Sequence, residues 1–189
     1  EPAFEIRHAD GNPTSVLSYV SHEQKAVEGG TETIIRLKDK LYPVNVTLHY
    51  VAYPQENIIK QWSEISHQEK ANITISRYAS SMLYLEDAKY YLNEFSGDWA
   101  KEMQIKSNEL NYGKKIVDTR LGSRTNMFVE PFFEVGLGGK VRENEGKVIM
   151  GTIGWTGNYR FTFEVDHNNA LRIISGINPD ASAYTLKKG

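Results

Sequence analysis

The sequence predicts an all-β fold, a two-layer antiparallel sandwich of about ten or more strands. Apolar and polar residues alternate in most segments, and turn-forming residues separate these segments at short intervals. Eleven Tyr, seven Phe and three Trp favour strands over helices. A chain of 189 residues is a length that one β-rich domain can fill, so a single domain over residues 1–189 is expected.

Five segments carry the strand pattern most clearly. In VNVTLHY (residues 44–50), Val44, Val46, Leu48 and Tyr50 share one face, and Asn45, Thr47 and His49 share the other. The other four are NITISRY (72–78), FFEVGL (132–137), VIMGTIGW (148–155) and YRFTFEV (159–165). A period of two residues is typical of strands with one buried face.

Turn signals lie between these segments, and each predicts a hairpin. They are DGNP (10–13), GG (29–30), GLGGK (136–140), TGN (156–158) and DHNNA (166–170). Helical periodicity is nearly absent, and short helical turns are expected only around residues 100–107.

Composition excludes several classes of function. The formal net charge is −2, and no block of Lys or Arg could neutralise a run of phosphates, so neither nucleic acid nor an anionic membrane is an expected partner. No apolar run is long enough to span a bilayer. Cysteine is absent, which rules out thiol catalysis, Cys-ligated zinc and disulfides. The cellular compartment stays open.

A search for catalytic chemistry finds no convincing candidate. The visible acidic pairs are Glu86 with Asp87, Glu143 with Glu145, and Asp98 with Glu102, and solvated charge is the simpler interpretation. No Ser lies in a G-x-S-x-G elbow, and GLGGK lacks the G-K-[ST] ending of a phosphate loop. The five histidines are scattered. The sequence therefore predicts no catalytic residue, no cofactor and no metal site.

The aromatic residues leave one question open. Trp62 and Trp155 belong to strand patterns and are expected to pack in the core or between sheets, whereas a lone strand histidine is expected at the surface. Trp99 instead follows Gly97 and Asp98 in FSGDWAKEM (95–103). Trp99 could stack on a pyranose while Asp98 accepts hydrogen bonds from hydroxyls. Alternatively, Trp99 plugs the edge of the core and Asp98 caps the following turn.

Several long runs resemble the amino-terminal β-sandwich domain of glycoside hydrolase family 36, the bacterial-type α-galactosidases. They are EPAFEIRHADGNP, LKDKLYPVNVTLHYVAYPQENIIKQWSEISH, FSGDWAKEM and FEVDHNNALRIISGINPDASAYTLKKG, in this order along the chain. The most specific pattern is GDWA followed by RTNMFVEPFFEV, in which relatives often carry His or Gln at the position of Asn126. The candidate residues for substrate binding or a domain interface are Gly97, Asp98, Trp99, Arg124 and Asn126.

The resemblance implies a galactose mutarotase-like supersandwich that precedes a (β/α)8 barrel and a carboxy-terminal β-domain. In the family the barrel holds both catalytic aspartates and hydrolyses terminal α-galactosides with retention. The chain is thus expected to be a non-catalytic part of a longer enzyme, with further strands upstream. Its expected partners are the barrel of the same polypeptide and, in a homo-oligomer, neighbouring subunits; an α-galactoside would be met only through the parent enzyme.

Two alternatives belong to other classes of function. One is a self-standing carbohydrate-binding module that uses Trp99 as a stacking platform. The other, less favoured, is an aldose epimerase-like domain on the same fold, which requires a histidine and a carboxylate facing each other in a cleft. The preferred linkage, the oligomeric state and any residues that reach an active site are left open.

Overall fold

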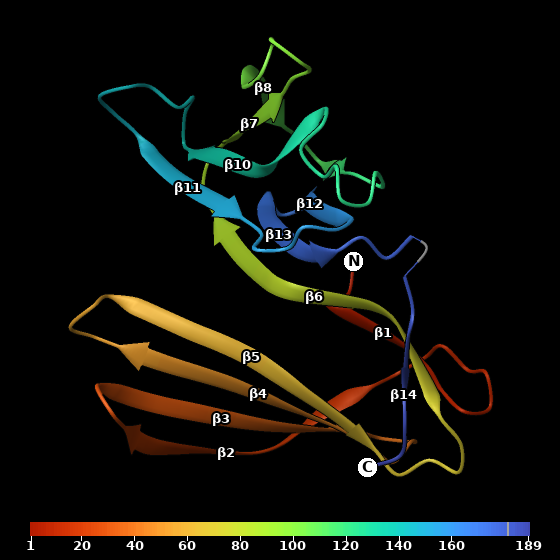
Figure 1. Ribbon diagram of the computed structural model, residues 1–189. Coiled ribbons are helices and arrows are strands. Elements are labelled where there is room, and N and C mark those ends of the chain that lie inside the picture. The colour runs from red at the N-terminus through yellow and green to blue at the C-terminus, as the bar shows by residue number, and fades with distance from the viewer. Residues whose placement is uncertain (181) are drawn as a thin grey trace. The chain divides into compact units, whose positions relative to one another are not determined.

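The computed structural model describes residues 1–180 and 182–189, and in them it contains strands and no helix (Figure 1). The strands are β1 (Phe4–Arg7), β2 (Leu17–Val27), β3 (Gly30–Asp39), β4 (Val44–Tyr53), β5 (Ile58–His67), β6 (Ile73–Glu86), β7 (Tyr90–Ser96), β8 (Gln104–Leu110), β9 (Gly113–Asp118), β10 (Val129–Leu137), β11 (Lys147–Thr152), β12 (Tyr159–Val165), β13 (Ala170–Ile177) and β14 (Tyr184–Leu186). Every pairing for which a register is defined is antiparallel. The predicted all-β antiparallel fold is confirmed.

All five segments with the clearest alternation form strands, in β4, β6, β10, β11 and β12. The expected helical turns around residues 100–107 are wrong. Residues 104–110 form strand β8, which pairs with β7 from Gln104 opposite Ser96 to Leu110 opposite Tyr90. Hydrogen bonding to a neighbouring strand overrides the weak local preference of a short polar segment.

The described residues contain no helix that is long and apolar enough to cross a membrane.

The chain divides into two compact units. Unit 1 comprises Glu1–Phe4 and Arg77–Ser182, and unit 2 comprises Glu5–Ser76 and Ala183–Gly189. Strands β1 and β6 each contribute residues to both units. The expectation of one domain over residues 1–189 stays a prediction.

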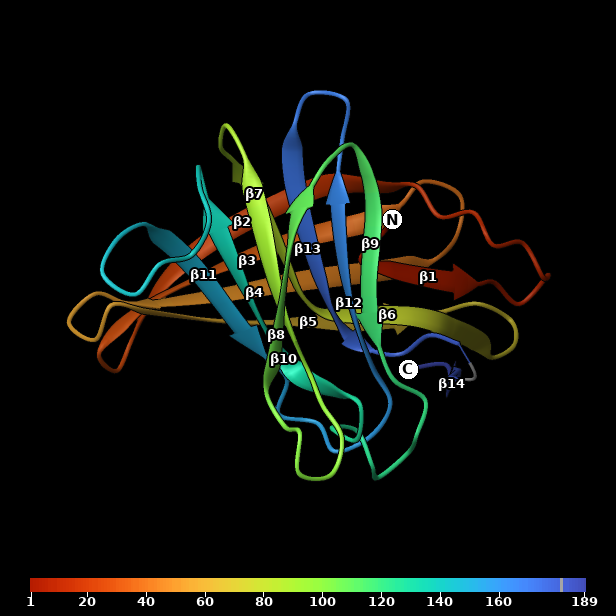
Figure 2. The same ribbon diagram turned by 90° about the horizontal axis from the view of Figure 1, so that it is seen from above.

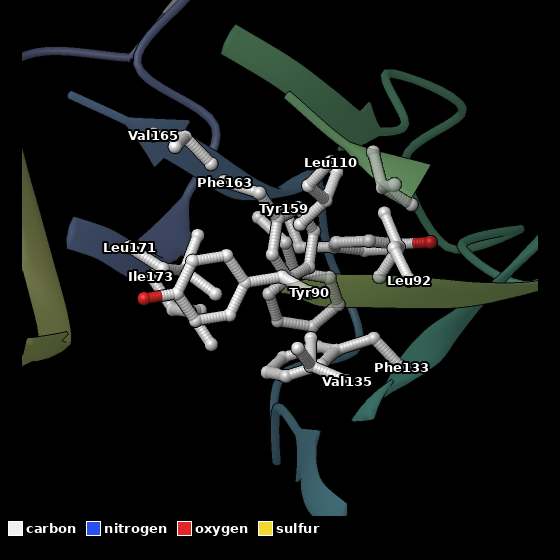
Figure 3. Packing of buried hydrophobic residues seen from close by; sticks show 12 residues of the cluster. Tyr90, Leu92, Leu110, Phe133, Val135, Tyr159, Phe163, Val165, Leu171 and Ile173 are labelled. Carbon is white, nitrogen blue, oxygen red and sulfur yellow. The ribbon is translucent and has the colours of Figure 1, made fainter. Parts of the chain in front are cut away.

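Unit 1 contains two layers of sheet. One layer has the strand order β11-β10-β7-β8, and the other has the order β6-β13-β12-β9 (Figure 2). The buried residues between them come from both layers: Tyr90, Leu92, Leu110, Val117, Phe133, Val135, Tyr159, Phe161, Phe163, Val165, Leu171 and Ile173. Figure 3 shows how closely these side chains pack. Phe133 of β10 meets Phe161 and Phe163 of β12 edge-on, with ring centroids 5.0 Å apart in both pairs.

Two tyrosines in this core have their hydroxyls satisfied by backbone groups. The Tyr90 hydroxyl donates to the Asn169 carbonyl at 2.8 Å and accepts from the Asp87 amide at 2.8 Å. The Tyr159 hydroxyl donates to the Val129 carbonyl at 2.9 Å, and burial raises the pKa of that hydroxyl. Both residues therefore contribute aromatic area without leaving a buried polar group unpaired.

Unit 2 contains the sheet β2-β3-β4-β5, whose strands follow one another in chain order (Figure 1). Val44 and Val46 are buried, as the alternation in β4 predicts. On the opposite face His49 is also buried, so its expected surface position is wrong. Its Nδ1 lies 2.7 Å from Glu32 Oε1, and its ring stacks on Trp62 with centroids 4.5 Å apart. A carboxylate partner makes burial of the imidazole tolerable.

Two of the three tryptophans depart from expectation in the same direction. Trp62 is 36% exposed and Trp155 is 47% exposed, so neither is a core residue. Trp62 lies on the terminal strand of its sheet, and Trp155 follows the end of β11. A strand pattern indicates which face a side chain occupies, but whether that face is covered depends on the tertiary arrangement.

The turn signals are confirmed where consecutive strands pair. Residues 29–30 join β2 to β3, residues 136–140 cover the end of β10 and the start of its connection to β11, and residues 166–170 join β12 to β13. The hairpins expected at 10–13 and 156–158 are wrong, because β1 and β2, and likewise β11 and β12, belong to different sheets. Turn chemistry reverses the chain but does not select the strand that pairs next.

Replacement of Phe161 by alanine is expected to destabilise the protein by about 3–5 kcal/mol, because the side chain is fully buried between the layers and its loss leaves a cavity. Urea denaturation followed by circular dichroism measures the change. The control is Phe128→Ala, which removes the same group from a residue that is 47% exposed, and should cost less than about 1 kcal/mol. Equal losses in the two variants would contradict this description of the core.

Candidate functional site

A hollow of about 250 Å³ lies in unit 1, next to the loop that joins β7 to β8. Its lining residues are Gly97, Asp98, Trp99, Glu102, Asn126, Met127 and Glu130. Four of the five residues singled out from the sequence therefore come together here, although two loops almost thirty residues apart supply them. The fifth, Arg124, is exposed and is not part of the lining.

The β7–β8 loop is held by its own polar groups. The Trp99 amide donates to Asp98 Oδ1 at 2.7 Å, and the Ala100 amide donates to Glu102 Oε1 at 3.0 Å. The Lys101 amide donates to the Asp98 carbonyl at 2.9 Å, which closes a turn. Both carboxylates thus shape the loop that presents Trp99.

Close backbone packing explains the glycine at the start of this loop. A Cβ at position 97 would lie 2.7 Å from the Lys101 carbonyl oxygen and 2.8 Å from Glu102 Cα. Ala100 and Met103 adopt φ values of 59° and 57°, in the left-handed region that non-glycine residues seldom occupy. The loop is therefore a constrained structure.

The second wall of the hollow comes from the segment before β10. The Gly97 amide donates to the Phe128 carbonyl at 3.1 Å, which ties the two loops together. The register between β10 and β7 then shifts between Val129 and Phe133, within the stretch that contains Glu130 and Pro131. Such an irregularity re-aims side chains at the end of a strand, and here Glu130 reaches the hollow.

Trp99 is 89% exposed. The interpretation in which it plugs the edge of the core is therefore wrong. The Asp98 side chain accepts from the adjacent Trp99 amide and not from an amide two or three residues on, so its predicted capping role stays a prediction. A large exposed aromatic side chain beside a hollow marks a surface that is available to a ligand or a partner. Sugar stacking stays a prediction.

The charges around the hollow limit its chemistry. Asp98, Glu102 and Glu130 contribute carboxylates, Asn126 contributes an amide, and no Lys, Arg or His is among the lining residues. Such a surface can accept hydrogen bonds from hydroxyl groups, and it repels anions. The general acid of a glycosidase lies in an apolar environment, whereas Asp98 and Glu102 are exposed. The hollow therefore suits binding better than bond cleavage.

Glu102, Met127 and Glu130 line the hollow but were not among the residues singled out from the sequence. Glu102 lies within the same FSGDWAKEM stretch, and the other two lie within RTNMFVEPFFEV. Their only sequence signal was this adjacency, since nothing local predicts that the two stretches meet.

Two buried histidine–glutamate pairs lie in unit 2, and none of their residues lines the hollow. The first pair is His49 with Glu32, described above. In the second, His8 Nδ1 lies 2.7 Å from Glu69 Oε1, and the His8 ring stacks on the Tyr42 ring. Hydrogen bonds from Lys25 and then from His49 hold the pKa of Glu32 below its ordinary value. In residues 1–180 and 182–189 no three acidic or histidine side chains are grouped as metal ligands.

Comparison with known proteins identifies the family. Residues 1–187 match the glycosyl hydrolase family 36 N-terminal domain. The chain belongs to this family. It is 28% identical over 173 residues to the α-galactosidase AgaA of Geobacillus stearothermophilus, covering 91% of the present chain and 23% of that relative. It is 25% identical over 202 residues to α-galactosidase 2 of Hypocrea jecorina, covering 100% of the chain and 27% of that relative.

Solved structures share the fold. The crystal structure of the family 36 α-galactosidase AgaA from Geobacillus stearothermophilus covers the whole chain with a TM-score of 0.86 at 24% identity. The α-galactosidase from Lactobacillus brevis does so with a TM-score of 0.84 at 24% identity. This family 36 N-terminal domain spans 28% and 27% of those two chains, about a quarter of the length of its relatives.

Replacement of Gly97 by alanine is expected to destabilise the protein by about 1–3 kcal/mol, because the added Cβ meets backbone atoms that cannot move aside cheaply. Urea denaturation measures the loss. Gly139→Ala is the matched control, since no atom lies within 4 Å of a Cβ at that position, and it should change stability by less than about 0.5 kcal/mol. A Gly97→Ala variant as stable as the control would show that the loop is not packed as described.

Proposed function

We propose that the chain is the non-catalytic N-terminal domain of a longer α-galactosidase. The observation that carries this proposal is that residues 1–187 match one N-terminal domain family, while the chain spans about a quarter of the length of relatives named as α-galactosidases. The catalytic part of the parent enzyme is then a barrel in the same polypeptide. The substrates of the parent enzyme are terminal α-galactosides, and the subunits of the parent enzyme assemble into a homo-oligomer.

The hollow supports a role without catalysis. Asp98 and Glu102 accept hydrogen bonds from amides of their own loop, so these carboxylates are already committed to holding its shape. Glycoside hydrolysis requires one carboxyl group that donates a proton and one that attacks or activates water. Asp98 and Glu102 are both exposed, so their environments do not differ in the way that keeps one carboxyl group protonated and the other ionised.

The purified 189-residue chain is expected to release no p-nitrophenol from p-nitrophenyl α-galactoside above the buffer rate, whereas the complete parent protein hydrolyses the same substrate. The reason is that the acid–base pair lies outside this domain. Absorbance of the released p-nitrophenol measures both rates. Hydrolysis by the chain alone that disappears in Asp98→Asn or Glu102→Gln would overturn the non-catalytic assignment.

A second candidate function, carbohydrate binding by this domain itself, is favoured by the exposure of Trp99 beside the hollow. An indole face can stack on a pyranose, while the carboxylates and the Asn126 amide accept or donate hydrogen bonds to its hydroxyls. An aldose epimerase is less well supported. His49 and Glu32 bond directly to each other under Trp62 instead of facing each other across a cleft.

For this second candidate, galactose and raffinose are expected to bind in the millimolar range, and Trp99→Ala is expected to abolish binding because the stacking surface is lost. Galacturonic acid should bind more weakly than galactose, since its carboxylate meets Asp98, Glu102 and Glu130. Isothermal titration calorimetry measures all three affinities.

Trp155→Ala is the matched control, because Trp155 is also exposed and is not part of the hollow. It should retain wild-type affinity for galactose. Absence of binding in the wild-type chain, or equal losses in both tryptophan variants, would leave the domain with the supporting role alone.

A further inference from the structure

Strand β5 (Ile58–His67) ends the sheet of unit 2, and within the described residues no other strand pairs along its outer side. It pairs with β4 over all ten residues without a register shift and contains no proline. Among the described residues, the backbone hydrogen bond that β5 makes outside the sheet is at its last residue, where the His67 carbonyl accepts from the Gly189 amide at 3.3 Å. Residues 58–66 therefore present a long, regular edge of backbone donors and acceptors.

The opposite edge of the same sheet is protected in ways that β5 is not. Strand β2 has a register shift between Tyr19 and Ser21, which interrupts the regular ladder. Such irregularities are a common means of preventing a further strand from pairing. The contrast between the two edges suggests that the edge of β5 is kept open for a partner.

The side chains of β5 also indicate a contact surface. Ile58, Ile59 and Trp62 are 56%, 72% and 36% exposed. Lys60 Nζ lies 5.3 Å from the Trp62 ring, and the Glu64 side chain is 67% exposed. The edge thus combines exposed apolar side chains with one exposed charge of each sign, and a regular, unpaired edge of this length can pair with another strand.

The sequence of the strand is complementary to itself. Consider two β5 strands that pair antiparallel with Trp62 opposite Trp62 of the partner subunit. Each residue before Trp62 then faces the residue that lies equally far after Trp62 of the partner subunit. Lys60 then faces Glu64 of the partner subunit, Gln61 faces Ser63 of the partner subunit, and Ile59 faces Ile65 of the partner subunit. Every charged residue between Ile58 and Ser66 meets the opposite charge.

Neighbouring registers lose this complementarity. With Gln61 at the centre, Lys60 faces Trp62 of the partner subunit and Glu64 faces Ile58 of the partner subunit. With Ser63 at the centre, Lys60 faces Ser66 of the partner subunit and Glu64 faces Trp62 of the partner subunit. Opposite charges directly across a strand pair stabilise it, so the register centred on Trp62 is the favoured one.

We propose that β5 is the contact between two copies of this chain, which pair antiparallel with their two-fold axis at Trp62. The two four-stranded sheets become one continuous sheet, and the contact is isologous, as in most symmetric dimers. Complementary charge argues for a second copy as the occupant. The proposal specifies the contact within the homo-oligomer that the proposed function includes, but it does not depend on α-galactosidase activity.

Charge reversal tests the pairing. The wild-type chain is expected to dimerise with rising concentration, as followed by analytical ultracentrifugation. Lys60→Glu and Glu64→Lys should each raise the dissociation constant on the order of tenfold or more, because each replaces two attractive pairs with two repulsive ones. The double variant Lys60→Glu/Glu64→Lys should restore the wild-type value. Lys38→Glu, on interior strand β3, is the matched control and should leave it unchanged.

Engineered cysteines test the register, since the chain contains none of its own. Facing residues of an antiparallel pair lie about 4.5–5.5 Å apart at Cα, within the range of a disulfide, whereas diagonal neighbours lie about 7–8 Å apart. A mixture of Gln61→Cys and Ser63→Cys chains should therefore form a disulfide-linked dimer under mild oxidation. Either variant alone should form much less of it.

The outcomes separate the possible occupants of this edge. A wild-type chain that stays monomeric, or a dimer insensitive to both charge reversals, overturns the proposal, as does equal cross-linking in the mixed and single samples. If the chain is monomeric but β5 is protected from hydrogen exchange only within the complete parent protein, another segment of that protein occupies the edge and the proposal is wrong. The p-nitrophenyl α-galactoside assay is independent of all these results.

Discussion

The contact of Phe133 with Phe161 and Phe163 is the constraint on which the rest of unit 1 depends. These three rings hold β10 of one sheet against β12 of the other and are almost completely excluded from water. Because close packing leaves little tolerance for rearrangement, the position of β10 fixes where its irregular start lies relative to β7. That placement also positions the two loops of the hollow. Gly97 directly follows β7 and Phe128 directly precedes β10, and the hydrogen bond from the Gly97 amide to the Phe128 carbonyl joins them.

Much of the fold could be predicted from local pattern because strand alternation is a local property. The alternating segments became β4, β6, β10, β11 and β12, and Gly29 with Gly30 became a hairpin turn as its composition indicates. What the pattern could not supply was strand order. Residues 156–158 lead from β11 into a strand of a different sheet, and no feature of TGN distinguishes that outcome from a hairpin.

The candidate site likewise contains some residues that the local sequence identifies and others that only the tertiary fold brings together. Gly97, Asp98 and Trp99 were recognisable as an unusual stretch, and a family motif brought Asn126 to attention. Glu130 was not recognisable, because it reaches the hollow through an irregularity in pairing between distant strands. The paired histidines were missed for a related reason. His8 and Glu69 are 61 residues apart, and His49 and Glu32 are 17 apart, so each residue taken alone resembles a surface residue.

The order in which unit 2 is assembled follows from the path of the chain. Its residues Glu5–Ser76 are completed by Ala183–Gly189, where β14 pairs with the start of β6 and His67 Nε2 donates to the Leu186 carbonyl at 3.1 Å. During synthesis all of unit 1 is therefore made before the last strand of unit 2. Contacts of such sequence separation close slowly, since loop entropy is lost before they contribute. The edge of β6 that receives β14 therefore stays unpaired for that interval, and an unpaired strand edge exposed during synthesis is a site of aggregation.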